Sequence, residues 1–191
     1  MGSPKSEFGH YAGAFHDAGK LLVNQLAESK GYRDLQACPI VFLYRHALEL
    51  YMKQIIITGN SLLRLSRKKP VLEVKDIGHD QLSKLVPVIK TIFDAVDWEW
   101  ELDIEGISSE EEFQKFLEDF EKIDPNSISF RYPTSKNGKA TLPKHFVFDV
   151  IDFSKKLDPI LNLFDGATTG LEELWQAGAE ATYEAQAQCY N

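Results

Sequence analysis

Residues 39–58 have the sequence PIVFLYRHALELYMKQIIIT, and this stretch decides the fold. Most of its positions are apolar all round a helix, which is the pattern of a central helix rather than of a surface one. Pro39 suits a first helical turn and Gly59-Asn60 suits an end, so we predict a helix over 39–58. One narrow stripe of this helix, within an arc of roughly 100°, is polar. Its members are Arg45, His46, Glu49 and Lys53.

The composition indicates one globular domain. The chain has 191 residues, of which 43% are hydrophobic and 26% are charged, so it can bury a substantial core. We place a single helical-bundle domain at 8–188, after a disordered tail at 1–7. The net charge of −8 makes bulk DNA binding unfavourable.

Several observations bear on the compartment of the protein. The apolar run at 40–57 carries three charged residues near its middle, which argues against a membrane span. The two cysteines, Cys38 and Cys189, form no disulfide framework. We find no signal peptide, and we therefore expect a reduced, cytoplasmic protein.

Three-to-four spacing of apolar residues predicts further helices on both sides of the central one. The first spans 8–29, where Gly31 provides a left-handed cap. A later one ends near 96, and Pro87 should kink it or divide it into two short helices. Between them, the basic cluster at 62–70, within which a helical turn can form, is expected to be a solvated loop; the alternative is an anion or nucleic-acid contact.

The second half of the chain repeats this pattern. Ser109 and Glu112 form a capping box that opens a helix ending before Pro125. The period returns from 146 to 164, breaks at 166–170, and resumes in a final helix toward 188, opened by a second capping box at Thr169 and Glu172.

Only 127–142 departs from the helical period. Ile128, Phe130 and Tyr132 alternate, and Asn137-Gly138 signals a tight turn, so we predict a small β-hairpin or an extended flap. The expected fold class is therefore all-α: an antiparallel helical bundle of about five to six helices with this one insertion.

The polar stripe is the best candidate for chemistry. Arg45, Glu49 and Lys53 follow one another at four-residue intervals, so they can pair along the helix. Two interpretations stay open: the pairs fix the register of a crowded interior, or they line a pocket where Arg45 binds an anion. We expect Arg45 to be partly open, with Glu49 orienting it, and loss of Glu49 to cost more stability than loss of Arg45. Arg131, in the insertion, either stacks on the bundle or brings its guanidinium over the stripe.

The motif PIVFLYRHALELYMK at 39–53, followed by Gly78-His79-Asp80 and by FRYP at 130–133, resembles prokaryotic members of the HEPN family. The resemblance implies an all-α antiparallel bundle of about five helices, often dimeric, with roles in RNA cleavage, nucleotide binding, or toxin and phage-defence systems. Nuclease members carry an Arg followed by a His after four to six intervening residues. No arginine of this chain has a histidine at that distance, which favours a non-catalytic or divergent member.

We therefore expect a HEPN-like, non-catalytic and homodimeric module that binds a nucleotide, RNA or a partner protein. The candidate ligand-binding residues are Arg45, His46, Glu49, Lys53, His79, Arg131 and Tyr132. The first alternative is a divergent metal-independent ribonuclease, in which His46 or His79 acts on the 2′-hydroxyl while Arg45 or Arg131 stabilises the phosphate. The second is a structural or interaction scaffold. No cofactor is expected and no metal site, since no histidine has a partner at a recognised zinc spacing.

Overall fold

The computed structural model of this chain describes residues 7–29, 34–71, 81–100, 102, 104–125, 127–143 and 147–189. Five α-helices make up most of these residues and no strand forms among them, so the all-α class is confirmed. The helices are α1 (Phe8–Glu28), α2 (Asp34–Leu65), α3 (Val86–Ala95), α4 (Glu110–Ile123) and α5 (Val150–Cys189). A short 3₁₀ helix, η2 (Leu82–Leu85), directly precedes α3.

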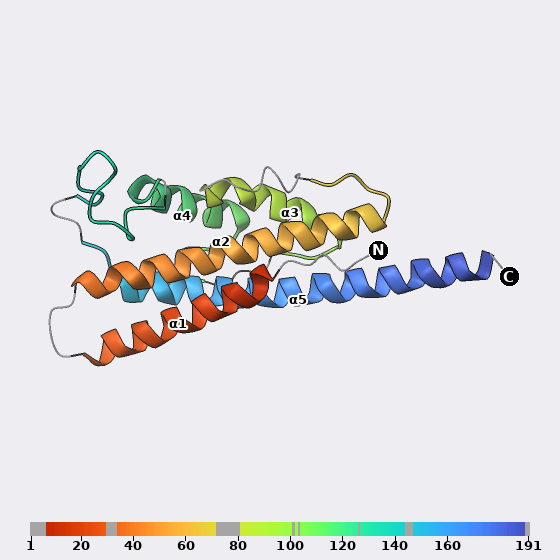
Figure 1. Cartoon of the computed structure of the whole chain (residues 1–191), viewed down its shortest axis with the longest axis horizontal. Helices are drawn as coiled ribbons and strands as arrows, with labels where there is room; N and C mark the ends of the chain where they lie inside the picture. Colours follow the sequence, from red (N-terminus) through yellow and green to blue (C-terminus); the bar gives the residue numbers. More distant parts are fainter. Residues whose placement is uncertain are drawn as a thin grey trace.

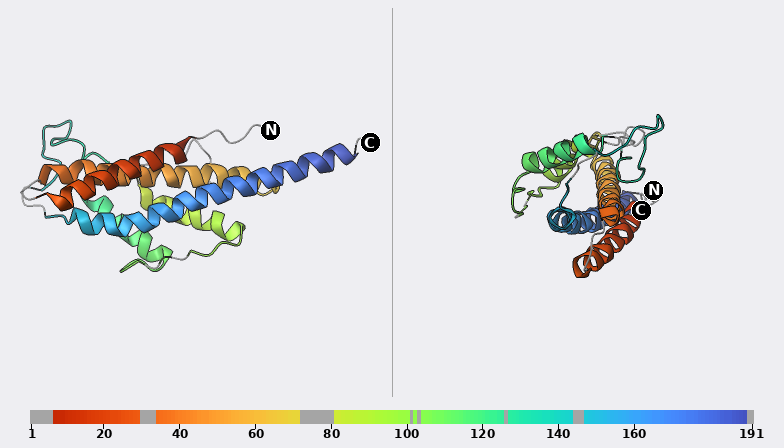
Figure 2. Two further views of the ribbon diagram at one scale, coloured as in Figure 1. Left: turned by 90° about the horizontal axis from the view of Figure 1, so that it is seen from below. Right: turned by 90° about the vertical axis from the view of Figure 1, so that its left-hand side faces the viewer.

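Helix α2 lies at the centre of the bundle, as its apolar sequence predicts. Helix α1 packs on one side of α2, α3 and α4 cover the other, and α5 runs alongside (Figure 1; Figure 2, right). Gly13 lies beside Tyr51, whereas Gly19 lies beside Tyr44, so α1 and α2 are antiparallel. This part of the predicted topology is confirmed.

Helices α2 and α5, by contrast, run in the same direction. The Tyr44 hydroxyl donates a hydrogen bond to Asp158 Oδ1 at 2.8 Å, and about two helical turns later the Tyr51 hydroxyl donates to Asp165 Oδ1 at 2.9 Å. Residue numbers therefore rise together along both helices, which is the parallel arrangement. The expectation of a wholly antiparallel bundle is wrong for this pair, because the long connection at 66–149 returns the chain to the end where α2 begins.

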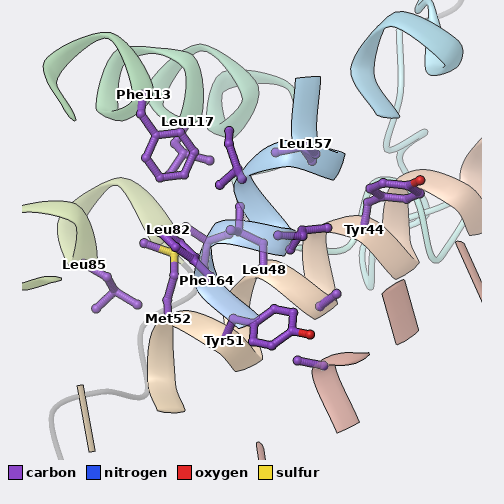
Figure 3. Packing of buried hydrophobic residues seen from close by; sticks show 14 of the residues in the cluster. Tyr44, Leu48, Tyr51, Met52, Leu82, Leu85, Phe113, Leu117, Leu157 and Phe164 are labelled. Carbon is purple, nitrogen blue, oxygen red and sulfur yellow. The ribbon is translucent and has the colours of Figure 1, made fainter. Parts of the chain in front are cut away.

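The core is built around the apolar faces of α2. Figure 3 shows tyrosine, leucine and methionine side chains of α2 meeting aromatic and leucine side chains from η2, α4 and α5. Fully buried members include Tyr44, Leu48, Tyr51, Met52, Leu82, Phe113, Leu157 and Phe164. Truncating one such leucine to alanine typically costs about 2–5 kcal/mol, so this cluster holds the elements in place.

The predicted boundaries 39–58 make α2 too short at both ends. The helix begins at Asp34, so Pro39 lies inside it rather than in its first turn. Proline in a helix interior removes one backbone hydrogen bond and crowds the preceding turn. Pro159 is likewise accommodated inside α5, so neither proline marks a helix end.

Gly59 and Asn60 do not stop α2 because both have other structural roles. A Cβ at Gly59 would lie 2.4 Å from Ile92 Cγ2, so the missing side chain lets α3 pack against α2. Asn60 is fully buried, and its Oδ1 accepts a hydrogen bond from the backbone N–H of Val71 at 2.8 Å. The helix therefore continues to Leu65.

The break predicted at 166–170 is also wrong, and α5 is continuous. Gly170 leaves room for the indole of Trp98, which a Cβ would approach to 2.9 Å. Thr169 opens no capping box; its hydroxyl donates to the Asp165 carbonyl oxygen at 3.2 Å, a bond typical of a helix interior. The chain consequently has five α-helices rather than six in its described part.

Two local predictions are confirmed. Pro87 lies at the start of α3, and the segment is divided into η2 and α3 as expected. Ser109 is the N-cap of α4, where its hydroxyl accepts a hydrogen bond from the Glu112 N–H at 3.2 Å. Both predictions rest on local chemistry that tertiary packing does not override.

At the amino terminus, residues 1–6 of the predicted disordered tail lie outside the described residues. Glu7 is described, and it is the N-cap of α1 rather than part of a tail. Its carbonyl oxygen accepts a hydrogen bond from the Tyr11 N–H at 3.2 Å.

The two-stranded hairpin predicted at 127–142 does not form. Tyr132 N–H donates to the Ile128 carbonyl at 3.0 Å, so the alternating residues form a turn instead of a strand. A single antiparallel bridge joins Thr134 and Ala140, closed by a turn in which Gly138 has φ +73°. Only the tight turn of the prediction is therefore present, within an irregular loop.

Candidate functional site

The polar stripe of α2 forms a connected row of charges. Lys53 Nζ lies 2.7 Å from Glu49 Oε1, while Arg45 Nη1 and His46 Nδ1 lie 3.5 Å and 3.9 Å from Glu49 Oε2. The other three predicted members therefore all lie against Glu49. Burial alone would raise the pKa of Glu49, but hydrogen bonds with His46 and Lys53, together with the nearby positive charges, lower it to about 2. Glu49 is therefore ionised at neutral pH.

Arg45 is the buried end of this row. Its side chain is only 2% exposed, because the segment after α4 folds over it. Arg45 Nη1 donates a hydrogen bond to Ser127 Oγ at 2.5 Å, and Arg45 Nε lies 3.7 Å from Asp124 Oδ2, on an equally buried carboxylate. The expectation that Arg45 is partly open is wrong, since its side chain is buried under this segment.

The loop after α4 is organised by these same contacts. Asp124, the C-cap of α4, accepts a hydrogen bond from the Ser129 N–H at 2.8 Å. Ser127 adopts the left-handed conformation with φ 55°, which is uncommon outside glycine. Its carbonyl oxygen accepts a hydrogen bond from Arg131 Nε. The loop thereby carries Arg131 from the buried charges to the surface of α2.

At the surface, Arg131 joins a row of aromatic side chains. Its Cζ atom lies 5.6 Å from the centroid of the Phe42 ring and 5.8 Å from that of Tyr132. Phe42 stacks on His46 with ring centroids 5.5 Å apart and an interplanar angle of 11°, and Phe15 contacts His46 edge-on with ring centroids 4.6 Å apart. We call Arg131, Phe42, His46 and Phe15 the cation–aromatic row.

One end of this row opens into a pocket between the start of α1 and the middle of α2. The pocket has a volume of about 400 Å³. Its lining is mainly apolar and aromatic, with one carboxyl and one imidazole group: Glu7, Phe8, Tyr11, Phe15, His46 and Leu50. A mainly apolar lining with a few polar groups is typical of sites that bind small molecules.

The structure brings some of the predicted site residues together and leaves others apart. His46 and Arg131 converge through Phe42, Tyr132 flanks Arg131, and Glu49 with Lys53 occupies the neighbouring turn of α2. His79, a candidate base and ligand, lies outside the described residues.

The sequence reasoning missed Phe42 and Phe15, and also the two loop residues Asp124 and Ser127. Phe42 could have been found, since it lies one turn before His46 on the same helix. Nothing local in the sequence signals that Asp124 and Ser127 contact Arg45, because these residues are far apart along the chain; Ser127 is 82 positions from Arg45.

Comparison of the chain with family models, with curated proteins and with solved structures finds no match. None of the helices in the described part combines the length and apolar character needed to cross a bilayer. Within those same ranges, no group of three or more histidine, cysteine, aspartate and glutamate side chains is arranged to hold a metal ion. The cation–aromatic row and its pocket are the features of the described residues that bear on function.

Proposed function

We propose that this chain is a HEPN-like, non-catalytic module that binds a nucleotide or single-stranded RNA at the cation–aromatic row. The observation that carries the proposal is the juxtaposition of the exposed Arg131 guanidinium, the Phe42 and His46 rings, and the adjoining pocket. Aromatic faces stack on nucleobases, at about 1–3 kcal/mol per base, while an arginine engages the phosphates.

Charge supports this location over a larger groove elsewhere on the described surface. A groove of about 670 Å³ lies between the end of α3 and α5, and its lining contains the carboxylates of Asp97 and Glu99 but no lysine, arginine or histidine. Those carboxylates would repel a phosphate. The cation–aromatic row therefore offers the better site, although the chain's net charge is −8.

The test is fluorescence anisotropy with a labelled oligouridylate and, separately, with ATP as a competitor. Replacing Phe42 with alanine removes the central ring of the row and should weaken binding about tenfold. The matched control is Tyr183→Ala, since Tyr183 is an aromatic residue that is 75% exposed and lies near the carboxyl end of α5. Equal affinity of both variants and the wild type would contradict the proposal.

A divergent, metal-independent ribonuclease is the second candidate. One observation favours it: the Phe42 ring alone separates the His46 imidazole from the Arg131 cation. Arg45 can no longer be the phosphate-stabilising group in that scheme, because it is buried and paired. We expect the wild type to cleave no more single-stranded RNA than a His46→Ala, His79→Ala double variant. Robust cleavage that this variant loses would establish the ribonuclease instead.

The HEPN resemblance also supports our proposals of a homodimer, a cytoplasmic location and a toxin–antitoxin or defence context. A partner protein or a purely scaffolding role remains the competing function. Large apolar side chains exposed on α1, such as Tyr11 and Leu21, offer surface for either kind of association. Light scattering coupled to size-exclusion chromatography would measure the mass of the protein in solution. A monomeric mass at high micromolar concentration would contradict the proposed homodimer.

A further inference from the structure

We infer that the outer nitrogens of Arg131 form a phosphate subsite, and that buried Arg45, acting through Ser127, is a positioning residue for it. The inference rests on the proposed function, because the phosphate is that of the bound nucleotide or RNA. It adds a buried group, remote from any ligand, that sets the orientation of the surface cation.

Arg131 is held at one side of its guanidinium and open at the other. Its Nε donates to the Ser127 carbonyl, and the planar group lies over the Phe42 ring at 5.6 Å. Within the described residues, neither Nη atom makes a hydrogen bond or an ion pair. An arginine fork with a fixed plane and free Nη donors matches the geometry of a phosphate, which it binds through two parallel hydrogen bonds.

Ser127 connects this cation to the interior. Its hydroxyl accepts from Arg45 Nη1 at 2.5 Å, and its carbonyl accepts from Arg131 Nε. The left-handed conformation at φ 55° is unfavourable for a serine, so the surrounding contacts must hold it. Arg45 donates the hydrogen bond that holds the Ser127 side chain. It thereby fixes the orientation of the Ser127 carbonyl group, which accepts the hydrogen bond from Arg131.

Phosphate fits better than an isolated carboxylate because of what lies next along the row. Phe42 stacks under Arg131 and then on His46, whose ring lines the pocket. A phosphate at Arg131 would thus place the attached sugar and base over aromatic faces, as in single-strand binding sites.

The experiment measures oligouridylate affinity as a function of KCl concentration. Each phosphate contact with a single strand contributes about 0.7 to the slope of log K against log [KCl]. Arg131→Met should lower the slope by about 0.7 and weaken binding about tenfold at low salt. Ser127→Gly keeps the left-handed backbone accessible but removes the hydroxyl, so it should reproduce both changes.

Two further variants separate positioning from general destabilisation. Ser127→Asn, which tolerates the left-handed conformation and offers Arg45 an acceptor, should recover part of the slope. The matched control is Ser129→Ala in the same loop. Among the described residues the Ser129 hydroxyl bonds only to the Ile123 carbonyl, at 3.1 Å, so its loss should leave the slope unchanged. The double variant of Arg131→Met with Ser127→Gly should bind no worse than Arg131→Met alone.

The outcomes separate three hypotheses: the proposed function, the phosphate subsite at Arg131, and the positioning role of Arg45 and Ser127. No RNA or nucleotide binding by the wild type would overturn the proposed function and the subsite together. A wild-type slope in Arg131→Met, with binding otherwise intact, would overturn the subsite alone. A reduced slope in Arg131→Met but a wild-type slope in Ser127→Gly would overturn the positioning role of Arg45 and Ser127.

Discussion

Replacing Arg45 with methionine should destabilise the protein by about 3–5 kcal/mol, the usual cost of stranding a buried charge. Methionine retains much of the aliphatic volume of arginine, so the substitution mainly removes the charge. The substitution leaves the Asp124 carboxylate without a nearby positive charge among the described residues, although its side chain is only 3% exposed. It would keep the hydrogen bond from the Ser129 N–H at 2.8 Å. Glu49 loses less, since Lys53 still pairs with it at 2.7 Å.

The assay is a urea melt followed by circular dichroism at the helical minimum. A domain of this kind has about 5–15 kcal/mol of stability, so the loss is large but leaves a measurable folded baseline. Adding Asp124→Asn should restore about half of the lost stability, because the amide oxygen still accepts from Ser129 and no charge is left unpaired. Glu49→Gln should cost less than Arg45→Met, the reverse of the order expected from the sequence.

The result that would refute this reasoning is a loss below about 1 kcal/mol for Arg45→Met, the scale of an exposed ion pair. If Arg45→Met fails to fold, the double variant decides: it should fold, since removing both charges leaves none stranded. An unfolded double variant would show that Arg45 stabilises the fold mainly through contacts that methionine cannot make, such as its hydrogen bond to Ser127, rather than by pairing with the charge of Asp124.

Three other predictions concern single contacts in the fold. Gly166→Ala should stabilise the protein by about 0.5–1 kcal/mol, because no atom lies within 4 Å of the new methyl group. Gly19→Ala should destabilise it by about 1–3 kcal/mol, because its Cβ would lie 2.7 Å from the Tyr44 ring, so thermal melts should show a higher melting temperature for the first variant and a lower one for the second. The pKa of Glu49 is lowered from 4.5 to about 2, so its contribution to stability is complete above about pH 4.5 and falls away as the pH drops toward 2; Glu49→Gln should flatten the acid arm of the stability profile over that interval. Tyr51→Phe should cost about 0.5–1.5 kcal/mol in urea, since it removes the 2.9 Å bond to Asp165, and no change would show that this bond contributes nothing net.

Elements governed by local chemistry could be predicted closely from the sequence. The predicted first helix, 8–29, matches α1 to within one residue, and the Ser109 cap opens α4 as expected. Those signals act within one or two helical turns. Gly59 shows where local rules fail, because its absent side chain is filled by Ile92 from α3, a contact that no local pattern reveals.

The candidate site was predictable only in part, for the same reason. The spacing of Arg45, Glu49 and Lys53 revealed their pairing along α2, which the structure confirms. Whether Arg45 is open or covered depends on the loop carrying Asp124 and Ser127, far away in the sequence. Periodicity places a side chain on a helix face, but it does not say which distant segment packs on that face.

The stripe on α2 therefore has two roles that one helix face can serve together. Arg45, its inner member, is neutralised by carboxylates and ties the loop to the helix, while His46, at 31% side-chain exposure, faces the row that ends in Arg131. The loop that covers Arg45 also carries Arg131, and both arginines bond Ser127: Arg45 its hydroxyl and Arg131 its carbonyl oxygen. A polar stripe on an otherwise apolar central helix is then explained without making every member a ligand. The buried charges hold the loop, and the loop supplies the exposed cation that a nucleotide would need.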